Sequence, residues 1–264
     1  MKLANLLLCL TVSLPLTTVH AATILVTGSD RGLGLEFVRQ YAIRGAQVIA
    51  TCRHPDTATE LKALAAGSHN IVIEKLDVAD DAEIRAIASK YKGHPIDLLI
   101  NNAAVLGAPE EQKSGSFSRK SFQETMGVNV FGALAVSDAL RENIIASKEK
   151  KIVALTSAFG SIPTVLRLQL PQSPYYYEIS KAALNMAMQA LGSELKPQGV
   201  IVGILNPGSV DTDLLAAGKA TYKLNVQALS KAESIGKLIS VIDHLDQDKA
   251  AQGINNYSGS ITPW

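Results

Sequence analysis

Residues 24–34 read Ile-Leu-Val-Thr-Gly-Ser-Asp-Arg-Gly-Leu-Gly, a short apolar run that opens directly into a glycine-rich turn. Apolar residues then recur at helical spacing over residues 35–42, so the segment predicts a strand, a turn and a helix. A dinucleotide-binding turn requires this context, although the spacing here is T-G-x-x-x-G-x-G rather than G-x-G-x-x-G. Gly28 permits a tight turn, Gly32 lets the backbone approach a pyrophosphate at the helix N-terminus, and Gly34 allows the helix to pack closely on the strand.

The same alternation continues along the chain. We expect short, almost entirely apolar strands at 24–26, 47–51, 71–76, 96–100, 151–156, 200–205 and 253–257. Further helices are expected at 56–66, 79–91, 118–147, 175–195 and 232–245, with an irregular stretch at 162–174 and a mobile or partly helical one at 214–230. Strands that are apolar throughout imply a sheet buried on both faces. The sequence therefore predicts an α/β chain with a single-domain Rossmann fold, whose doubly wound, mostly parallel sheet has seven strands.

Composition limits the function classes. The chain has 264 residues, of which 47% are hydrophobic and 19% charged, and a formal net charge of +1. This length suits one domain with a sizeable core, and the balanced charge gives no support for nucleic acid or an anionic membrane as a partner. The five His residues are scattered without metal-ligand spacing, so no metal site is expected. The two Cys residues form no disulfide framework.

The N-terminus has a different character. Lys2 precedes an uncharged apolar run over residues 3–16, and small residues follow at Ala21 and Ala22. This order is typical of a secretory signal peptide, with cleavage expected after Ala21 or Ala22. We therefore divide the chain into a signal peptide, 1–21, and a dinucleotide-binding domain, 22–264. We expect an exported protein, periplasmic or secreted, with no stable membrane span after cleavage; the alternative is a cytoplasmic protein with a hydrophobic N-terminal extension.

The residues expected near the adenosine ribose favour NADP(H) over NAD(H). A NAD site usually has an acid about 20 residues beyond the glycines, and here the first acid is Asp56, which follows Pro55. Arg53 ends the second strand instead, and Arg31 lies inside the glycine-rich turn. Two guanidinium groups at this position suit a 2′-phosphate. The alternative is that both are ordinary surface residues, which is a stronger case for Arg53 than for Arg31.

Tyr177 and Lys181 are four residues apart, so on the expected helix 175–195 they lie one turn apart on the same face. A phenol with a pKa of about 10 is a poor proton donor or acceptor at neutral pH. A fixed positive charge beside it favours the phenolate and brings the pKa toward a useful range. The spacing by itself is common, and a half-buried Tyr beside a solvated Lys would also produce it. Three tyrosines are consecutive at 175–177, and only Tyr177 has a Lys four residues further on.

Taken in order, these motifs resemble those of the short-chain dehydrogenase/reductase family over the whole region 22–264. The matching segments are the cofactor turn Thr27–Gly34, the adenine contact Asp77-Val78, the sheet-stabilising Asn101-Asn102-Ala103, the tetrad Asn129, Ser157, Tyr177 and Lys181, and the nicotinamide-side segment Asn206-Pro207-Gly208 with Thr212. Within the family, the chain looks like the C-factor/sniffer-like carbonyl reductase subgroup. The segments that carry this closer likeness are Arg31–Gln40, Ser180–Asn185 and the terminal Pro263-Trp264.

The resemblance implies hydride transfer between NADP(H) and a small carbonyl or alcohol substrate. Tyr177 would be the general acid/base, Lys181 would lower its pKa and hold the nicotinamide ribose, Ser157 would donate to the developing oxyanion, and Asn129 would hold a water. The implied cofactor contacts are Gly28, Asp30, Arg31, Gly32, Leu33, Gly34, Arg53, Asp77, Val78, Asn102, Ala103, Tyr177, Lys181, Pro207, Gly208, Val210 and Thr212. A homo-oligomer is also implied, because the family commonly dimerises through its late helices. The alternative from another class is a non-catalytic NADP-binding sensor or signalling protein on the same fold.

The chain departs from the family pattern in two places. Ala104 stands where the family usually has Gly, which is a mild packing change. The gap of 20 residues from Ser157 to Tyr177 is longer than usual, so an insertion at about residues 161–174 is expected to loop over the substrate side. Ser161 is therefore the alternative to Ser157. The expected lid, at about 209–230, is aliphatic and small, which favours a modest apolar carbonyl compound.

Overall fold

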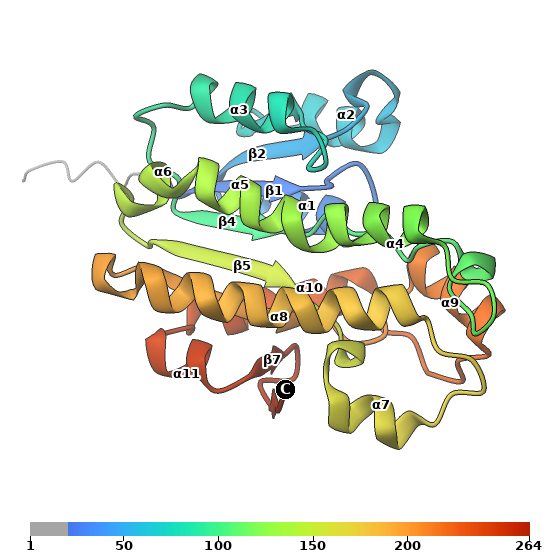
Figure 1. Cartoon of the computed structure of the whole chain (residues 1–264). Coiled ribbons are helices and arrows are strands. Elements are labelled where there is room, and N and C mark those ends of the chain that lie inside the picture. The colour runs from blue at the N-terminus through green and yellow to red at the C-terminus, as the bar shows by residue number, and fades with distance from the viewer. Residues whose placement is uncertain (1–20) are drawn as a thin grey trace, which may run out of the picture.

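Figure 1 shows the computed structural model, which describes residues 21–264. The predicted signal peptide lies outside the described residues, apart from its last residue. Within the described part, one sheet has the strand order β3-β2-β1-β4-β5-β6-β7-β8, and all neighbouring pairs are parallel except β7 and β8. The strands are β1 Thr23–Thr27, β2 Gln47–Cys52, β3 Ile71–Lys75, β4 Leu98–Asn101, β5 Lys151–Leu155, β6 Ile201–Asn206, β7 Ile254–Asn256 and β8 Ile261–Thr262. The α/β class, the single domain and the mostly parallel sheet predicted from the sequence are thus confirmed.

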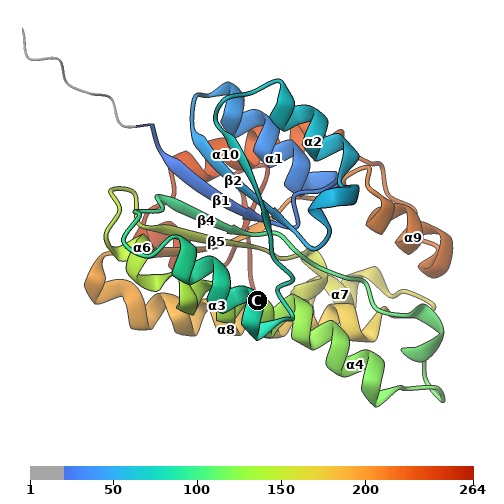
Figure 2. The same cartoon turned by 90° about the horizontal axis from the view of Figure 1, so that it is seen from above.

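Helices cover both faces of the sheet, as the view from above shows (Figure 2). One layer contains α1 Gly32–Ile43, α2 Thr59–Ala66 and α10 Lys231–Asp243, and the other contains α3 Asp81–Lys90, α5 Ala133–Ala139 and α8 Tyr175–Leu195. The remaining α-helices of the described chain are α4 Arg119–Met126, α6 Arg141–Ile145, α7 Ile162–Leu168, α9 Asp213–Tyr222 and α11 Gln247–Ala251. None of the helices in residues 21–264 is long and apolar enough to cross a membrane.

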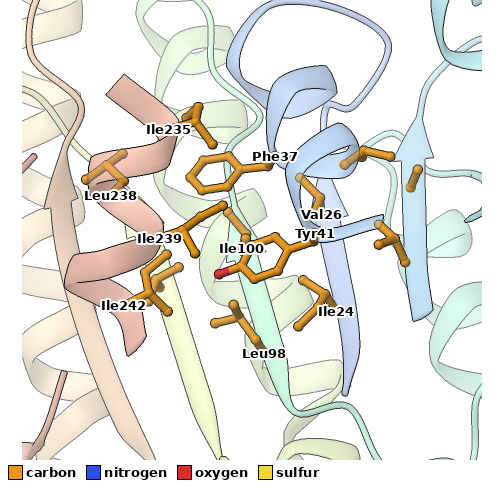
Figure 3. Close-up of a cluster of buried hydrophobic side chains, with 14 of the residues drawn as sticks. Ile24, Val26, Phe37, Tyr41, Leu98, Ile100, Ile235, Leu238, Ile239 and Ile242 are labelled. Carbon is orange, nitrogen blue, oxygen red and sulfur yellow. The ribbon is translucent and has the colours of Figure 1, made fainter. Parts of the chain in front are cut away.

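The core is divided by the sheet into two apolar clusters. Figure 3 shows part of the first, where Phe37 and Tyr41 of α1 and Ile239 of α10 pack around Ile24 of β1 and Leu98 of β4. Burial of each such side chain contributes about 1.5–3 kcal/mol of transfer free energy. Leu35, Val38 and Tyr41, whose spacing predicted this helix from the sequence, are all buried on the same side of α1.

Two expectations about regular structure were incomplete. An eighth strand is present, because Ile261 and Thr262 pair antiparallel with β7; two residues are too few to form a recognisable alternating pattern. The single helix expected at 118–147 consists of α4, a π-helical turn η3 at Gly127–Gly132, α5 and α6. A Cβ at Gly132 would lie 2.7 Å from the carbonyl oxygen of Val78, so this turn makes a close backbone approach that hydrophobic periodicity does not reveal.

The segment expected to be irregular and the segment expected to be mobile or partly helical each contain a helix. In the insertion, α7 forms although Pro163 lies in its first turn, where the missing N–H costs no helical hydrogen bond. In the expected lid, α9 begins at the N-cap Thr212, whose Oγ1 accepts a hydrogen bond of 3.3 Å from the backbone N–H of Leu215. Both helices lie beyond the carboxyl ends of the central strands, on the same side as the glycine-rich turn (Figure 1).

Candidate active site

A cavity of about 1220 Å³ opens at the carboxyl ends of the parallel strands. It lies where the strand order reverses, between β1 and β4, which is where ligands bind in open α/β sheets. All the predicted site residues except Gly34 and Asn129 line it. Those that do are Gly28, Asp30, Arg31, Gly32, Leu33, Arg53, Asp77, Val78, Asn102, Ala103, Ser157, Tyr177, Lys181, Pro207, Gly208, Val210 and Thr212.

The glycine-rich turn forms one end of the cavity. Gly28 and Gly32 have φ angles of +66° and +60°, which L side chains rarely adopt. The space over Gly32 is open, since a Cβ there would meet nothing closer than 3.9 Å, and the first N–H groups of α1 follow directly. Gly34 lies behind the turn, where a Cβ would be 2.1 Å from the carbonyl oxygen of Gly28. The turn therefore offers backbone donors and a helix N-terminus to an anionic group such as a pyrophosphate.

Asn102 and Thr27 fix this turn against the end of β4. The Asn102 side chain donates hydrogen bonds of 2.8 and 2.9 Å to the carbonyl oxygens of Thr27 and Gly28. In return, the Thr27 hydroxyl accepts from the backbone N–H groups of Asn102 and Ala103, at 3.0 and 3.1 Å. These four bonds hold the ends of β1 and β4 together at the point where the strand order reverses.

The two arginines expected at the adenosine end differ in their contacts. Arg31 Nη1 lies 3.0 Å from Asp213 Oδ2 at the start of α9, and both side chains are largely exposed. An exposed ion pair of this kind is worth about 0–1 kcal/mol, so it leaves the guanidinium available to a ligand. Arg53 lies exposed just after β2 and has no ion-pair partner within residues 21–264. Both arginines line the cavity.

Tyr177 and Lys181 lie on one face of α8, and both line the cavity. Lys181 is almost fully buried, and its Nζ donates a 2.8 Å hydrogen bond to the carbonyl oxygen of Leu155 at the end of β5. The same nitrogen lies 5.5 Å from the centre of the Tyr177 ring. The neighbouring Tyr176 points away, with its hydroxyl donating to the carbonyl oxygen of Ser118, while Tyr175 is exposed. Tyr177 is thus the member of the tyrosine run that faces the cavity.

Burial controls the pKa values of this pair. It raises the pKa of Tyr177 to about 12, an effect that the nearby Ser157 hydroxyl partly opposes. It lowers the pKa of Lys181 to about 8. The sequence predicted that Lys181 would lower the pKa of Tyr177; in this structure burial raises that pKa instead.

Ser157 lies two residues after β5 and lines the cavity beside Tyr177. Its hydroxyl accepts a 3.2 Å hydrogen bond from the backbone N–H of Phe159, which begins the short 3₁₀ turn η4 at Ala158–Gly160. The alternative, Ser161, is fully buried and donates a 2.7 Å hydrogen bond to the carbonyl oxygen of Pro263 near the C-terminus. The geometry therefore favours Ser157 over Ser161 as the partner of Tyr177.

Asn129 lies behind the cavity wall, in the π-helical turn η3. Its side chain is fully engaged: Oδ1 accepts from the Val105 N–H, and Nδ2 donates to the Val105 carbonyl oxygen and to Ser180 Oγ, all at 2.8–2.9 Å. Ser180 in turn donates to the carbonyl oxygen of Tyr177. The amide thus connects the loop after β4 to α8, and a water at Asn129 would have to use the backbone of η3 rather than the amide N–H groups.

The segment after β6 closes the other side of the cavity. Gly208 has a φ of +79°, and a Cβ there would lie 2.6 Å from the ring of Tyr257. Its N–H donates to Asn206 Oδ1, and Ser234 of α10 donates to the carbonyl oxygen of Pro207. These contacts hold the backbone of 206–210 in place at the cavity edge.

Most residues on the substrate side of the cavity were not predicted from the sequence. Further lining residues there are Val105, Leu106, Phe159, Thr164, Leu168, Tyr222, Leu224 and Val226. Thr164 and Leu168 are one turn apart on α7, and Tyr222 ends α9. The long gap before Tyr177 and the aliphatic stretch after Gly208 indicated where two of these walls would lie. The individual residues were not predicted, because they come from α7, from the end of α9 and from loops that pack around the cavity.

The family model described as short chain dehydrogenase matches residues 22–223. The chain belongs to the short chain dehydrogenase family. Among curated relatives of this family, C-signal of Myxococcus xanthus is 30% identical over 181 residues, covering 69% of this chain and 100% of the relative. The match confirms the family expected from the motif order.

Solved structures of the same family agree. An NADPH-bound carbonyl reductase from chicken fatty liver superposes with a TM-score of 0.82 at 28% identity, covering 93% of this chain and 100% of the other. The carbonyl reductase Sniffer of D. melanogaster gives a TM-score of 0.78 at 26% identity, with the same coverage. The resemblance to the carbonyl reductase and sniffer group is therefore also confirmed.

The buried charge of this dehydrogenase site gives a prediction about stability. Because burial lowers the pKa of Lys181 from 10.5 to about 8, the folded protein below pH 8 carries an ammonium that the unfolded chain would hydrate better. Lys181→Met should raise the free energy of unfolding at pH 7 by about 1–3 kcal/mol, allowing for the lost bond to Leu155. The gain should shrink as the pH rises from about 8 to 10.5, where the lysine is neutral in both states.

Urea unfolding of the wild type and Lys181→Met across this pH range measures the effect, with the exposed Lys92→Met as the control, which should stay within about 0.5 kcal/mol of the wild type. A loss of stability at pH 7 on replacing Lys181 would contradict the account.

Proposed function

We propose that the protein is an NADP(H)-dependent oxidoreductase that transfers a hydride between nicotinamide and a small carbonyl or alcohol compound. One observation carries this proposal: Tyr177, Lys181 and Ser157 converge in the same cavity as a glycine-rich turn at a helix N-terminus. Perturbed titratable groups concentrate at functional sites, and here a phenol and an ammonium are both shifted by burial.

The residues present fit the dinucleotide. Backbone donors of the open turn at Gly32 suit the pyrophosphate, and Asp77 and Val78 line the adenine end. Arg31 and Arg53 would hold a 2′-phosphate through charge-assisted hydrogen bonds. Two similar structures support NADP: the chicken carbonyl reductase contains NADPH, and a short-chain dehydrogenase/reductase from Burkholderia multivorans, 27% identical with a TM-score of 0.79, contains NADP. When bound, the cofactor would supply or accept the hydride.

The chain's own residues would donate the proton to the substrate oxygen or accept it. With a pKa of about 12, Tyr177 keeps its proton at neutral pH and can donate it to the oxygen of a carbonyl compound as that oxygen gains negative charge. Ser157, beside the phenol, would donate a second hydrogen bond to the same oxygen. Lys181 would stabilise the tyrosinate left behind, since the buried ammonium is close to the ring and has few other partners. In the reverse direction Tyr177 must first lose its proton, so alcohol oxidation should gain rate as the pH rises.

The walls around Tyr177 indicate the substrate class. Phe159, Leu168, Leu224 and Val226 give an apolar surface on the substrate side, and Thr164 and Arg167 of α7 add polar groups to it. A small aldehyde or ketone with an apolar body fits this surface, and apolar pockets of this kind bind by burying such groups.

Tyr177→Phe is the direct test of the proton donor. The variant should fold and bind NADPH as the wild type does, and its turnover of any carbonyl compound that the native protein reduces should fall by about 10²–10⁴ because no general acid remains. NADPH oxidation followed at saturating carbonyl compound measures this. Tyr175→Phe, at the exposed neighbouring tyrosine, is the matched control and should retain wild-type turnover. Turnover of Tyr177→Phe within about tenfold of wild type would exclude the assigned role.

Arg53→Ala tests the preference for the phosphorylated cofactor. Loss of a charge-assisted contact to a 2′-phosphate should raise the KM for NADPH by about 10- to 100-fold and leave the KM for NADH within about twofold. Arg39→Ala on the outer face of α1 provides the control. Equal effects on both cofactors would mean that Arg53 does not contact the phosphate.

We further propose export and self-association. Export is supported by Lys2, the apolar run 3–16 and the small residues at 21–22. N-terminal sequencing of the fractionated protein tests it. We expect a chain that starts at Ala22 or Thr23 outside the cytoplasm, and an intact Met1 inside the cytoplasm would contradict export.

Self-association is supported by Ile179 and Met186, which lie two turns apart on one face of α8 and are exposed. Light scattering on the purified protein should give more than the monomer mass.

A further inference from the structure

Ser157 and Tyr177 are neighbours in space, although 20 residues separate them in the chain. Most of the intervening segment belongs to α7 and the loop after it, and the outer face of α7 leaves Ile162 and Leu166 exposed. A long connection with so many exposed residues does not by itself fix the distance between the Ser157 and Tyr177 side chains. The position of Ser157 must therefore be fixed by contacts outside that segment.

Asn185 supplies such contacts from α8. It lies one turn after Lys181 and two turns after Tyr177, so the three residues share one face of the helix. Its Oδ1 accepts a 2.6 Å hydrogen bond from the hydroxyl of Thr156, and its Nδ2 donates a 3.1 Å bond to the carbonyl oxygen of Gly160. Thr156 immediately precedes Ser157, and Gly160 follows it by three residues. A single buried amide thus holds the Thr156 side chain before Ser157 and the backbone of Gly160 after it.

The packing around this amide leaves little freedom. A Cβ at Gly160 would lie 2.8 Å from Asn185 Nδ2 and 2.9 Å from the carbonyl carbon of Lys181, so η4 rests directly on the backbone of α8. Thr156 and Asn185 are each 3% exposed. Next in the chain, Ser161 is tied to Pro263 near the C-terminus. The backbone from 156 to 161 is therefore attached before the inserted helix begins.

We propose that Asn185, through Thr156 and Gly160, is a positioning residue that holds Ser157 opposite Tyr177, whatever the length of the inserted segment. This rests on the proposed function, in which Ser157 and Tyr177 act on the same substrate oxygen. It also explains how the chain accommodates a long insertion between two groups that must act together. The segment 161–174 can then form part of the substrate wall without carrying the catalytic geometry.

The test uses variants of the full-length protein that change the hydrogen bonds of Asn185 to Thr156 and Gly160, here called the clamp, and keep Ser157 and Tyr177. Asn185→Leu removes both hydrogen bonds, Thr156→Val removes one hydroxyl, and Thr156→Ser keeps it. Asn185→Leu and Thr156→Val should lower kcat for a carbonyl compound by about 10- to 100-fold, since a misplaced group costs that much. The Kd for NADPH should stay within twofold, and Thr156→Ser should restore turnover.

Asn143→Leu is the matched control for a loss of stability alone. Asn143 is also a buried amide that bridges backbone carbonyl groups, those of Tyr91 and His94, and it lies outside the residues that line the cavity. It should lower Tm to a similar extent as Asn185→Leu and leave kcat within twofold of wild type. In the Ser157→Ala background, Asn185→Leu should cause little further loss of kcat, because both changes remove the same contribution.

Hydrogen exchange at residues 157–161 supplies a readout that needs no turnover. Asn185→Leu should speed exchange there and leave β1 and β4 unchanged. If the wild type reduces no carbonyl compound, the proposed function fails, and exchange alone then decides whether the clamp holds this turn. Unchanged exchange, a kcat within twofold of wild type in Asn185→Leu, or a full further loss in the Ser157→Ala background would each overturn the proposal.

Discussion

The site depends on a buried lysine whose ammonium is held by the end of a central strand. Lys181 is almost fully enclosed, and the Leu155 carbonyl oxygen at the end of β5 accepts its hydrogen bond at 2.8 Å. Burying an ammonium with so little compensation is unfavourable, as the lowered pKa of this group reflects. A fold retains such a group where function requires it. The hydrogen bond also joins α8, which carries Tyr177, to the end of β5, which leads into Ser157.

The fold provides this arrangement through its topology. Parallel strands end at the same edge of the sheet, so the turn after β1, the turn after β5 and the segment after β6 reach one cavity although they lie far apart in the chain. The bonds between Asn102 and the Thr27–Gly28 backbone fix the cofactor end, and the Asn185 amide fixes the turn that carries Ser157. Helices α7 and α9 lie outside these contacts and line the substrate side of the cavity.

What the sequence predicted follows from periodicity and from the chemistry of short motifs. The strands and α8 were predictable because apolar runs and helical spacing are local signals, and Tyr177 was distinguished from its neighbours by Lys181 alone. α7 was missed because Pro163 suggested irregular chain, and β8 because two residues carry no period. The pKa of Tyr177 was predicted in the wrong direction for the protein alone, since the pair spacing gives the neighbouring charge but not the degree of burial. The roles of Asn129 and Asn185 depend on contacts between distant segments, which no local pattern encodes.

We propose that this cavity performs carbonyl chemistry with a bound nicotinamide cofactor rather than merely holding the cofactor. The most direct measurement is NADPH oxidation by the purified wild-type protein against a panel of small apolar aldehydes, ketones and quinones, with NADPH binding followed by fluorescence in the same samples. We expect NADPH to bind and at least one compound to be turned over. Binding of NADPH without turnover of any of them would contradict it and favour a sensor on the same fold.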